Sequence, residues 1–358
     1  MLSLDAAGLI RLTAAIATLF VAAVTQVQSA TVGSFVDDAI AELGFDPAQK
    51  TALEAGTVIS VGLADIERQP NELTVGAAMM LVRRPLAVVA DAVVDDATFR
   101  VNTDILDFRR IGDGSQSREQ IDAIFRDVGY TVEENAETTK LLRFKDGDEF
   151  NFSDREIANF GALEVVDGSA QAQASAALAD VLRQRFFAYL GGGLESVEPY
   201  VRGRGKSASA GQELTVALSA LELLQRHFPV FYQSLLRYPQ QLPADTTNRF
   251  YWIKRKSGDR PAFVLAHRME QRTSDYVVGA ELQFYVGHSY NSALTLIACV
   301  PVEEGTLVLS ILRLFTDQVT GFASGMKRNV GRGQVVEAVT DHLEEMRTAL
   351  EKVIDGGG

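Results

Sequence analysis

Residues 287–291, with the sequence Gly-His-Ser-Tyr-Asn, come closest in this chain to a catalytic motif. The nucleophile elbow of serine hydrolases has the pattern Gly-x-Ser-x-Gly, and it lifts the serine out of a sheet where a strand turns sharply into a helix. Here Asn291 replaces the last glycine, and residues 293–302 favour a strand over a helix. Asp317 and His342 would complete the acid and the base in hydrolase order, although His342 falls within a predicted helix. The motif leaves two hypotheses, a serine nucleophile and a polar hairpin corner whose side chains bond the backbone.

Other patterns with binding or catalytic chemistry are weaker. Residues 205–207, Gly-Lys-Ser, match the end of a phosphate-binding loop, but Tyr200 stands where that motif requires its first glycine. No group of histidine, cysteine and acidic residues has the spacing of metal ligands, so we expect neither a metal nor another cofactor. The single cysteine, Cys299, lies in an apolar run and is expected to be a small buried side chain. None of these patterns assigns a catalytic residue.

The strongest structural signals lie in residues 246–358, which predict a β-meander and a C-terminal helix. Runs rich in β-branched and aromatic residues alternate with short turns between residues 250 and 315 and predict five strands. Such turns join antiparallel neighbours. Residues 333–354 then predict a long amphipathic helix, because apolar residues repeat at spacings of three and four. The apolar stripe, which we expect to pack against the sheet, comprises Val336, Val339, Leu343, Met346, Leu350 and Val353.

Residues 31–165 predict an α+β part that completes the same domain as the meander. Within it, residues 57–66 and 73–82 predict a hairpin, since both runs are rich in β-branched and apolar residues and a turn separates them. Further short strands are predicted at residues 130–132 and 140–144.

Residues 166–245 predict an additional helical layer. Apolar residues recur there at helical spacing, and glycines at 191–193 end the first helix. In the part before this layer, Ser117 and Ser153 are each followed three residues later by Gln or Glu, which is the capping-box signature of a helix start. The sequence as a whole therefore predicts the α+β class.

The composition excludes one class of partner. The chain of 358 residues has 34 basic and 47 acidic side chains and a net charge of −13. Its basic residues form only two short clusters, at 202–206 and 254–260, which predict solvated loops or a hairpin turn. A protein that binds nucleic acid needs a concentrated basic face, so we do not expect such a partner.

The first thirty residues have the features of an export signal. An apolar run at residues 12–25 follows Arg11 and precedes a stretch that ends in small residues. The run is shorter than the roughly 20 residues that span a membrane. We therefore expect residues 1–30 to be a signal peptide and the protein to be periplasmic or secreted. If the segment is not cleaved, the protein would be membrane-anchored, and a buried helix is the third alternative.

The order of these elements resembles the helix-grip architecture of the START-type lipid-transfer and polyketide-cyclase superfamily. The resemblance covers residues 57–94, 250–315 and 333–354, whereas residues 166–245 form a longer helical layer than the usual insert. In that superfamily the sheet wraps around the last helix and leaves an apolar cavity. Residues 283–291 and 315–319 are also similar to those of uncharacterised exported bacterial proteins, from which no activity carries over.

This resemblance implies an exported binding protein for a lipid or another apolar small molecule. We expect the cavity, if the core is not solid, to be lined from the sheet and the last helix. A slip of one residue would turn each strand residue to the other face. Two other functions stay open: a hydrolase or cyclase that uses Ser289 or His288 in the same cavity, and an envelope scaffold that binds a protein partner through residues 166–245. The candidate ligand-binding residues are Phe284, Val286, Leu296, Ile311 and Leu343, with His288 and Tyr290 as polar anchors.

Overall fold

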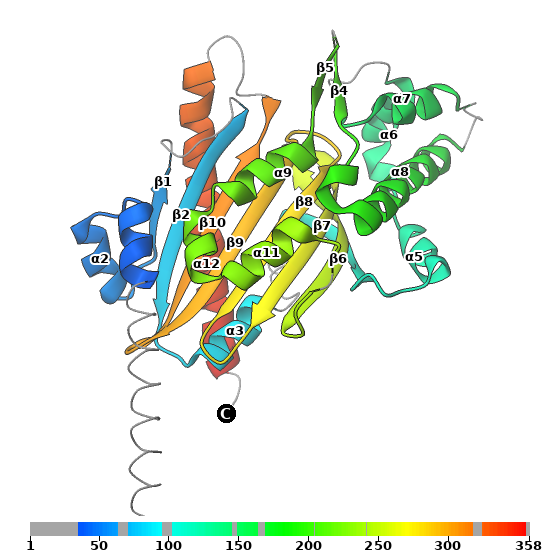
Figure 1. Cartoon of the computed structure of the whole chain (residues 1–358). Coiled ribbons are helices and arrows are strands. Elements are labelled where there is room, and N and C mark those ends of the chain that lie inside the picture. Colours follow the sequence, from blue (N-terminus) through cyan, green and yellow to red (C-terminus); the bar gives the residue numbers. More distant parts are fainter. Residues whose placement is uncertain are drawn as a thin grey trace, which may run out of the picture.

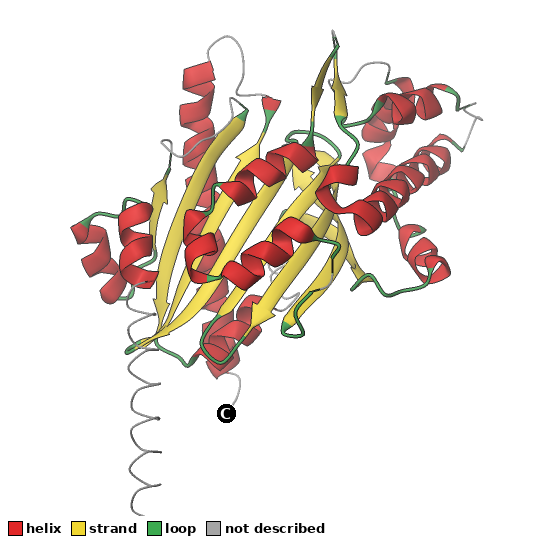
Figure 2. Cartoon of the chain, viewed as in Figure 1, coloured by secondary structure: helices red, strands yellow, loops and turns green. Residues whose placement is uncertain are grey.

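Within the described part of the chain, eight strands form one antiparallel sheet in the order β1-β2-β10-β9-β8-β7-β6-β3 (Figure 1). Helices lie on both faces of this sheet (Figure 2). The computed structural model describes residues 35–63, 71–94, 102–144, 149–163, 169–203, 205–240, 242–317 and 324–355. The predicted α+β class is confirmed, and the predicted leader lies outside the described residues.

The predicted five-strand meander is confirmed, because each of its strands pairs antiparallel with the next along the chain. Its turns are short. Between the first two strands Gly258 has a φ of 61°, a backbone conformation that glycine adopts without steric penalty. The strands are β6 (Thr246–Ser257), β7 (Arg260–Arg272), β8 (Val277–Val286), β9 (Ser292–Val302) and β10 (Gly305–Phe315).

Three strands from the first part of the chain extend the meander at its two edges. The predicted hairpin is confirmed: β1 (Ile59–Gly62) pairs with β2 (Glu72–Val82), and β2 pairs with β10. At the other edge β3 (Ile105–Gly112) pairs with β6, a strand that the sequence did not reveal. Most side chains of β3 are exposed or half-buried, so it lacks the alternation of a half-buried strand.

The C-terminal helix α12 (Ser324–Asp355) crosses behind the sheet and packs mainly on β2 and β1 (Figure 1). Gly76 on β2 allows the close approach, because a Cβ there would lie 3.2 Å from Cγ1 of Val335. Val336 is only half-buried, so the apolar stripe begins one residue earlier than predicted. The side chains of the last two predicted stripe residues lie outside the described set. The buried stripe is Val335, Val339, Leu343 and Met346, and α3 (Leu86–Val94) packs beside it.

The predicted helical layer covers the opposite face of the sheet. Helices α9 and α11 lie in front of the meander, whereas α8 lies beside the β6 edge (Figure 1). The main hydrophobic core fills the space between this layer and the sheet, with large side chains such as Phe231 and Phe250 fully buried. The layer comprises α8 (Ala170–Gly192), α9 (Ala210–Ser219), α10 (Glu222–His227) and α11 (Pro229–Arg237).

The structure contradicts the strands predicted at residues 130–132 and 140–144. The first region enters a 3-10 turn, η2 (Val132–Glu134), and the second lies almost wholly in α6 (Asn135–Arg143). By contrast, both predicted capping boxes are present, at the starts of α5 (Arg118–Phe125) and α7 (Asp154–Gly161). The remaining elements are a helix at residues 35–42, α2 (Pro47–Glu54), η3 (Gly193–Ser196), and the hairpin of β4 (Tyr200–Arg202) with β5 (Lys206–Ala208).

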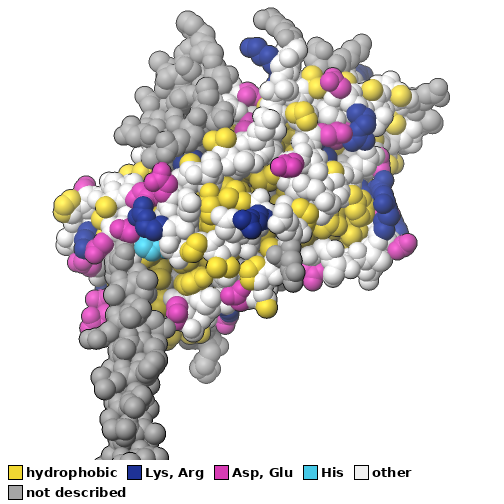
Figure 3. Space-filling model, in the orientation of Figure 1, with side chains coloured by type: hydrophobic (Ala, Val, Ile, Leu, Met, Phe, Trp, Pro, Cys, Tyr) yellow, Lys and Arg dark blue, Asp and Glu magenta, His cyan; other side chains and the backbone are white. Residues whose placement is uncertain are grey.

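The surface of the helical face carries charges of both signs. In Figure 3 basic and acidic side chains are interspersed, and apolar side chains gather between the helices. None of the helices among the described residues is long and apolar enough to cross a membrane.

Candidate ligand-binding cavity

A cavity of about 670 Å³ lies between α12 and the sheet face opposite the helical layer. Its walls come from β6 to β10, from Ile105 at the start of β3 and Asn102 just before it, and from one side of α12. The volume falls within the range of about 300–1,000 Å³ that is usual for small-molecule sites. From α12 the cavity is lined by Gln334, Val335, Ala338, Val339 and His342.

One part of the cavity wall is apolar. Ile253 on β6 and Val264 on β7 are cross-strand partners, and both belong to a buried cluster with Tyr290 and Ala293. Leu312 on β10 packs against the same cluster. These side chains provide a surface on which the apolar part of a ligand would be shielded from water.

A continuous chain of polar side chains crosses the same wall. Arg268 Nε donates to Glu281 at 2.6 Å, and Gln283 Nε2 donates to the other oxygen of that carboxylate at 2.8 Å. The Tyr290 hydroxyl donates to Gln283 Oε1 at 2.6 Å, and Arg255 Nη1 lies 3.4 Å from that hydroxyl. Two arginines therefore stand at the ends of a chain that contains one carboxylate.

Other polar groups of the wall are partnered differently. Arg249 pairs with Glu270 across β6 and β7, with 3.1 Å between Nη2 and the carboxylate. The hydroxyl of Ser310 is buried and has no hydrogen-bond partner among the residues that the structure describes. Burial lowers the pKa of His342, and the nearby Arg268 lowers it further, so this imidazole is neutral at pH 7.

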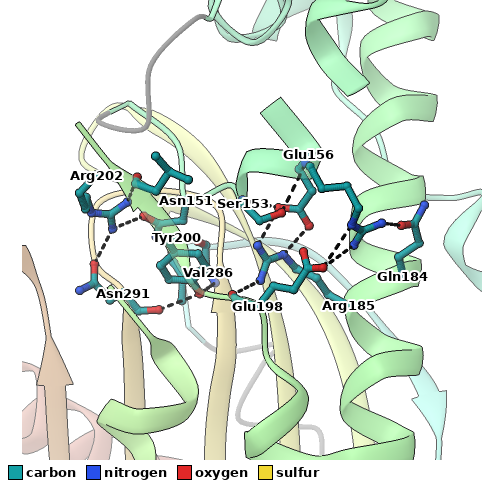
Figure 4. A network of polar contacts seen from close by, with 12 residues as sticks. Asn151, Ser153, Glu156, Gln184, Arg185, Glu198, Tyr200, Arg202, Val286 and Asn291 are labelled. Atoms are coloured by element: carbon teal, nitrogen blue, oxygen red, sulfur yellow. Dashed lines mark hydrogen bonds and ion pairs between the residues drawn. The ribbon is translucent and has the colours of Figure 1, made fainter. Parts of the chain in front are cut away.

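The turn between β8 and β9, which presents Ser289 and Tyr290 to the cavity, is held by a polar network (Figure 4). Asn151 Nδ2 donates to the carbonyl oxygens of Val286 and Tyr290, at 2.8 and 2.7 Å. Arg202 donates in turn to the side-chain oxygens of Asn151 and Asn291. Because these bonds fix the backbone on both sides of Ser289, the residue keeps a φ of 77°, which is unusual for a side chain other than glycine.

A buried ion pair supports the same network (Figure 4). Arg185 on α8 binds both oxygens of Glu156 on α7, at 2.8 and 2.6 Å. The guanidinium also lies 5.2 Å from the ring centre of Tyr200 and 4.7 Å from that of Tyr285. Tyr200 donates its hydroxyl hydrogen to the carbonyl of Asn291, so the ion pair packs against a side chain that holds the turn.

The structure places three of the predicted lining residues on the other face of the sheet. Leu296 and Ile311 are cross-strand partners, so they lie on the same face of the sheet, as expected for residues of one cavity wall. That face, however, is the one under the helical layer, and both residues belong to its core. Phe284 lies there too and stacks on Tyr189, with 3.9 Å between ring centres. Helices cover both faces of this sheet, and both faces contain apolar side chains, so the apolar pattern alone could not indicate which face meets α12.

A β-bulge accounts for the separation of Phe284 from Val286. In the pairing of β8 with β7, Tyr285 and Gln283 face consecutive residues, and Phe284 is the extra one. Alternation is therefore reversed across the bulge. As a result Val286 lies in the buried cluster on the cavity side, with Tyr290, although it does not reach the cavity wall.

The remaining predicted residues differ in their distance from the cavity. Tyr290 lines it and belongs to the polar chain. Leu343 on α12 is fully buried against the sheet, and its neighbour His342 reaches the cavity instead. His288 is buried in the turn, where its Nε2 lies 3.1 Å from the carbonyl of Pro261.

In the hydrolase hypothesis, the acid Asp317 is engaged by another side chain, and the base His342 lines the cavity, as Ser289 does. Asp317 pairs with Arg202, at 2.7 Å, and His342 lies on α12. The hydroxyl of Ser289 instead lies 2.6 Å from Nδ1 of its neighbour His288. Burial, together with the charge of Arg260, lowers the pKa of His288 to about 4. A base with that pKa takes up a proton poorly at neutral pH, so the pair is weakly suited to activate a serine.

The charged cavity residues were missed by sequence reasoning. Glu281 and Gln283 occupy alternate positions of an otherwise apolar strand. On β6, Arg249, Ile253 and Arg255 are separated by even numbers of residues, so they lie on one face of the strand. Polar side chains at a period of two within buried strands indicate one polar face. That signal was present, although the sequence did not show that the polar face and the cavity coincide.

Comparison of the chain with protein-family models, with curated proteins and with solved structures found no match. The resemblance to the START-type superfamily accordingly stays a prediction, and the cavity is interpreted from its own residues.

Proposed function

We propose that this protein binds an amphiphilic small molecule in the cavity between its sheet and α12. The observation that carries the proposal is the combination of an apolar cluster around Ile253 and Val264 with a polar chain that ends at Arg255. A purely apolar lipid would cover the Arg255 end of that chain without offering a partner to its charge, which is unfavourable. A molecule with an apolar body and one polar end would satisfy both parts of the wall.

The N-terminal sequence supports a place of action for this binding protein. Residues 1–30 have the features of an export signal, and we propose that the protein works in the periplasm or outside the cell. A binding protein in either place would carry an amphiphile through water, where its apolar part is poorly soluble.

Native mass spectrometry of the full chain, purified from its own host without detergent, tests the proposal. We expect an added mass from a bound amphiphile that organic solvent extracts. Ala338→Trp is the informative variant, because Ala338 lies on the exposed side of α12 and lines the cavity. Its larger side chain should fill the space and abolish the added mass.

Glu337→Trp is the matched control, since Glu337 is exposed and does not line the cavity. This variant should keep the ligand. If the wild-type protein is empty and takes up no amphiphile from a host lipid extract, the proposal is wrong. Equal ligand content in the two tryptophan variants would place the ligand elsewhere on the molecule.

A second candidate function is acyl transfer at Ser289, which the short contact with His288 Nδ1 favours. A fluorophosphonate probe labels an activated serine hydroxyl covalently. Labelling of wild-type protein that is lost in Ser289→Ala would support the hydrolase, and absence of labelling would contradict it. The low pKa of His288 leads us to expect no labelling.

A further inference from the structure

The charged residues that line the cavity do not balance. Three arginines, Arg249, Arg255 and Arg268, face two carboxylates, those of Glu270 and Glu281. Each carboxylate belongs to a short salt bridge with a different arginine, at 3.1 and 2.6 Å. Among the described residues, Arg255 is the cavity arginine that forms no salt bridge.

The surroundings of Arg255 leave its hydrogen-bonding capacity largely unused. Its Nη1 is 3.4 Å from the hydroxyl of Tyr290, a neutral group, and its Nε has no hydrogen-bond partner within the described part of the chain. Two carboxylates act on it electrostatically, Asp104 and Glu281. Asp104 is exposed to solvent, and Glu281 is already shared by Arg268 and Gln283.

An arginine in this position keeps its charge, because a guanidinium does not lose its proton in proteins. A partly buried charge without a partner is unfavourable and is usually compensated by an anion. The apolar cluster begins beside it, since Ile253 lies two residues away on the same face of β6. A cationic group thus stands next to an apolar wall inside one cavity.

We propose that the ligand of this cavity is an apolar molecule with one carboxylate, and that Arg255 binds this carboxylate while the apolar part lies against Ile253, Val264 and Leu312. This inference rests on the proposed function and specifies the class of its ligand. The planar guanidinium suits a carboxylate because two of its N–H groups can donate in parallel to the two oxygens.

The test compares three probes that share a sixteen-carbon chain: hexadecanoic acid, hexadecanol and hexadecylamine. Affinities of the full chain, after extraction of bound lipid, are measured by calorimetry at pH 8 and at probe concentrations below micelle formation. We expect the acid to bind more tightly than the alcohol by at least about tenfold, which corresponds to one charge-assisted hydrogen-bond pair. The amine should bind most weakly.

Arg255→Gln should remove the preference of the protein for the acid and change its affinity for the alcohol less than about twofold, because the apolar wall is intact. Arg109→Gln is the matched control, since Arg109 is an exposed arginine on the neighbouring β3, outside the cavity. It should behave as the wild type. Arg255→Lys, which keeps the charge but not the planar fork, should retain part of the preference.

The comparison of the three probes on wild-type protein decides the question even if Arg255→Gln does not fold. Equal affinity for acid and alcohol, or tighter binding of the amine, would overturn the role of Arg255 while leaving a cavity that binds amphiphiles. If none of the probes binds and no host ligand is present, the proposed function itself fails. A preference for the acid that persists in a folded Arg255→Gln protein would also overturn the inference.

Discussion

Replacing Arg185 by methionine should destabilise the protein strongly. The Arg185 and Glu156 side chains are 3% and 2% exposed, so the pair is fully removed from water. The substitution would leave the Glu156 carboxylate buried with the backbone N–H of Ser153 as a remaining donor. Breaking one partner of a buried ion pair costs about 3–5 kcal/mol. Because the unfolding entropy grows with chain length, a loss of 1 kcal/mol lowers Tm by about 1–2 °C in a chain of 358 residues, and we expect a fall of about 5 °C.

Thermal unfolding followed by circular dichroism and urea unfolding would measure this loss. The double variant Arg185→Met with Glu156→Gln should recover at least half of it, because the buried charge is then neutral and the glutamine can still cap α7. Arg226→Met is the control, since Arg226 pairs with Asp38 at the surface, and little change is expected. A double variant no more stable than Arg185→Met alone would refute the reasoning, as would a single variant as stable as the wild type.

Three further predictions concern other parts of the fold. Lowering the pH from 7 to 5 should destabilise the protein by about 2 kcal/mol for each of His267 and His288. In the folded protein the pKa of His267 is lowered to about 3 and that of His288 to about 4, so both stay neutral at pH 5. In the unfolded chain the same histidines take up protons below about pH 6.5, which favours unfolding. His267→Gln should show a smaller loss over this pH range, and an unchanged loss would contradict the assignment. Phe284→Ala should lower the free energy of unfolding in urea by about 3–5 kcal/mol. The affinity for the ligand should not change, since Phe284 packs on Tyr189 away from the cavity. An altered affinity would contradict that placement. Gly76→Val should loosen the packing of α12, because the new valine side chain would overlap Val335. Faster amide hydrogen exchange in α12 would report this loosening. Exchange as slow as in the wild type would show that the helix shifts to accommodate the valine.

The elements that the sequence predicted well depend on local patterns. The turns of the meander and the stripe through Val339 and Leu343 can be recognised within windows of ten to twenty residues, and they lie where expected. The short runs were harder. Residues 140–144 contain apolar residues that suit a strand or a helix equally, and packing of α6 on α8 decides for the helix.

The cavity depended on non-local facts that no window of sequence contains. Leu296 and Ile311 are cross-strand partners and therefore lie on the same face of the sheet, as the sequence predicted. Which face α12 covers depends on the path of the chain after β10, and the strand pattern does not indicate that path. The bulge at Phe284 depends on the pairing of β8 with β7. The partners of the polar chain are distributed over β6, β7, β8 and the following turn, so Arg255 could not be linked to Tyr290 before the strands were placed.

The bulge at Phe284 also divides β8 into positions that can be altered for different purposes. Before it, odd-numbered residues such as Glu281 and Gln283 face the cavity, while Leu282 lies in the core under the helical layer. Variation restricted to the odd positions, and to their neighbours on β9 such as Thr295, would reshape the ligand wall and leave that core intact. The strand thus offers a natural scaffold for libraries of altered ligand preference, in which a loss of binding could be separated from a loss of folding.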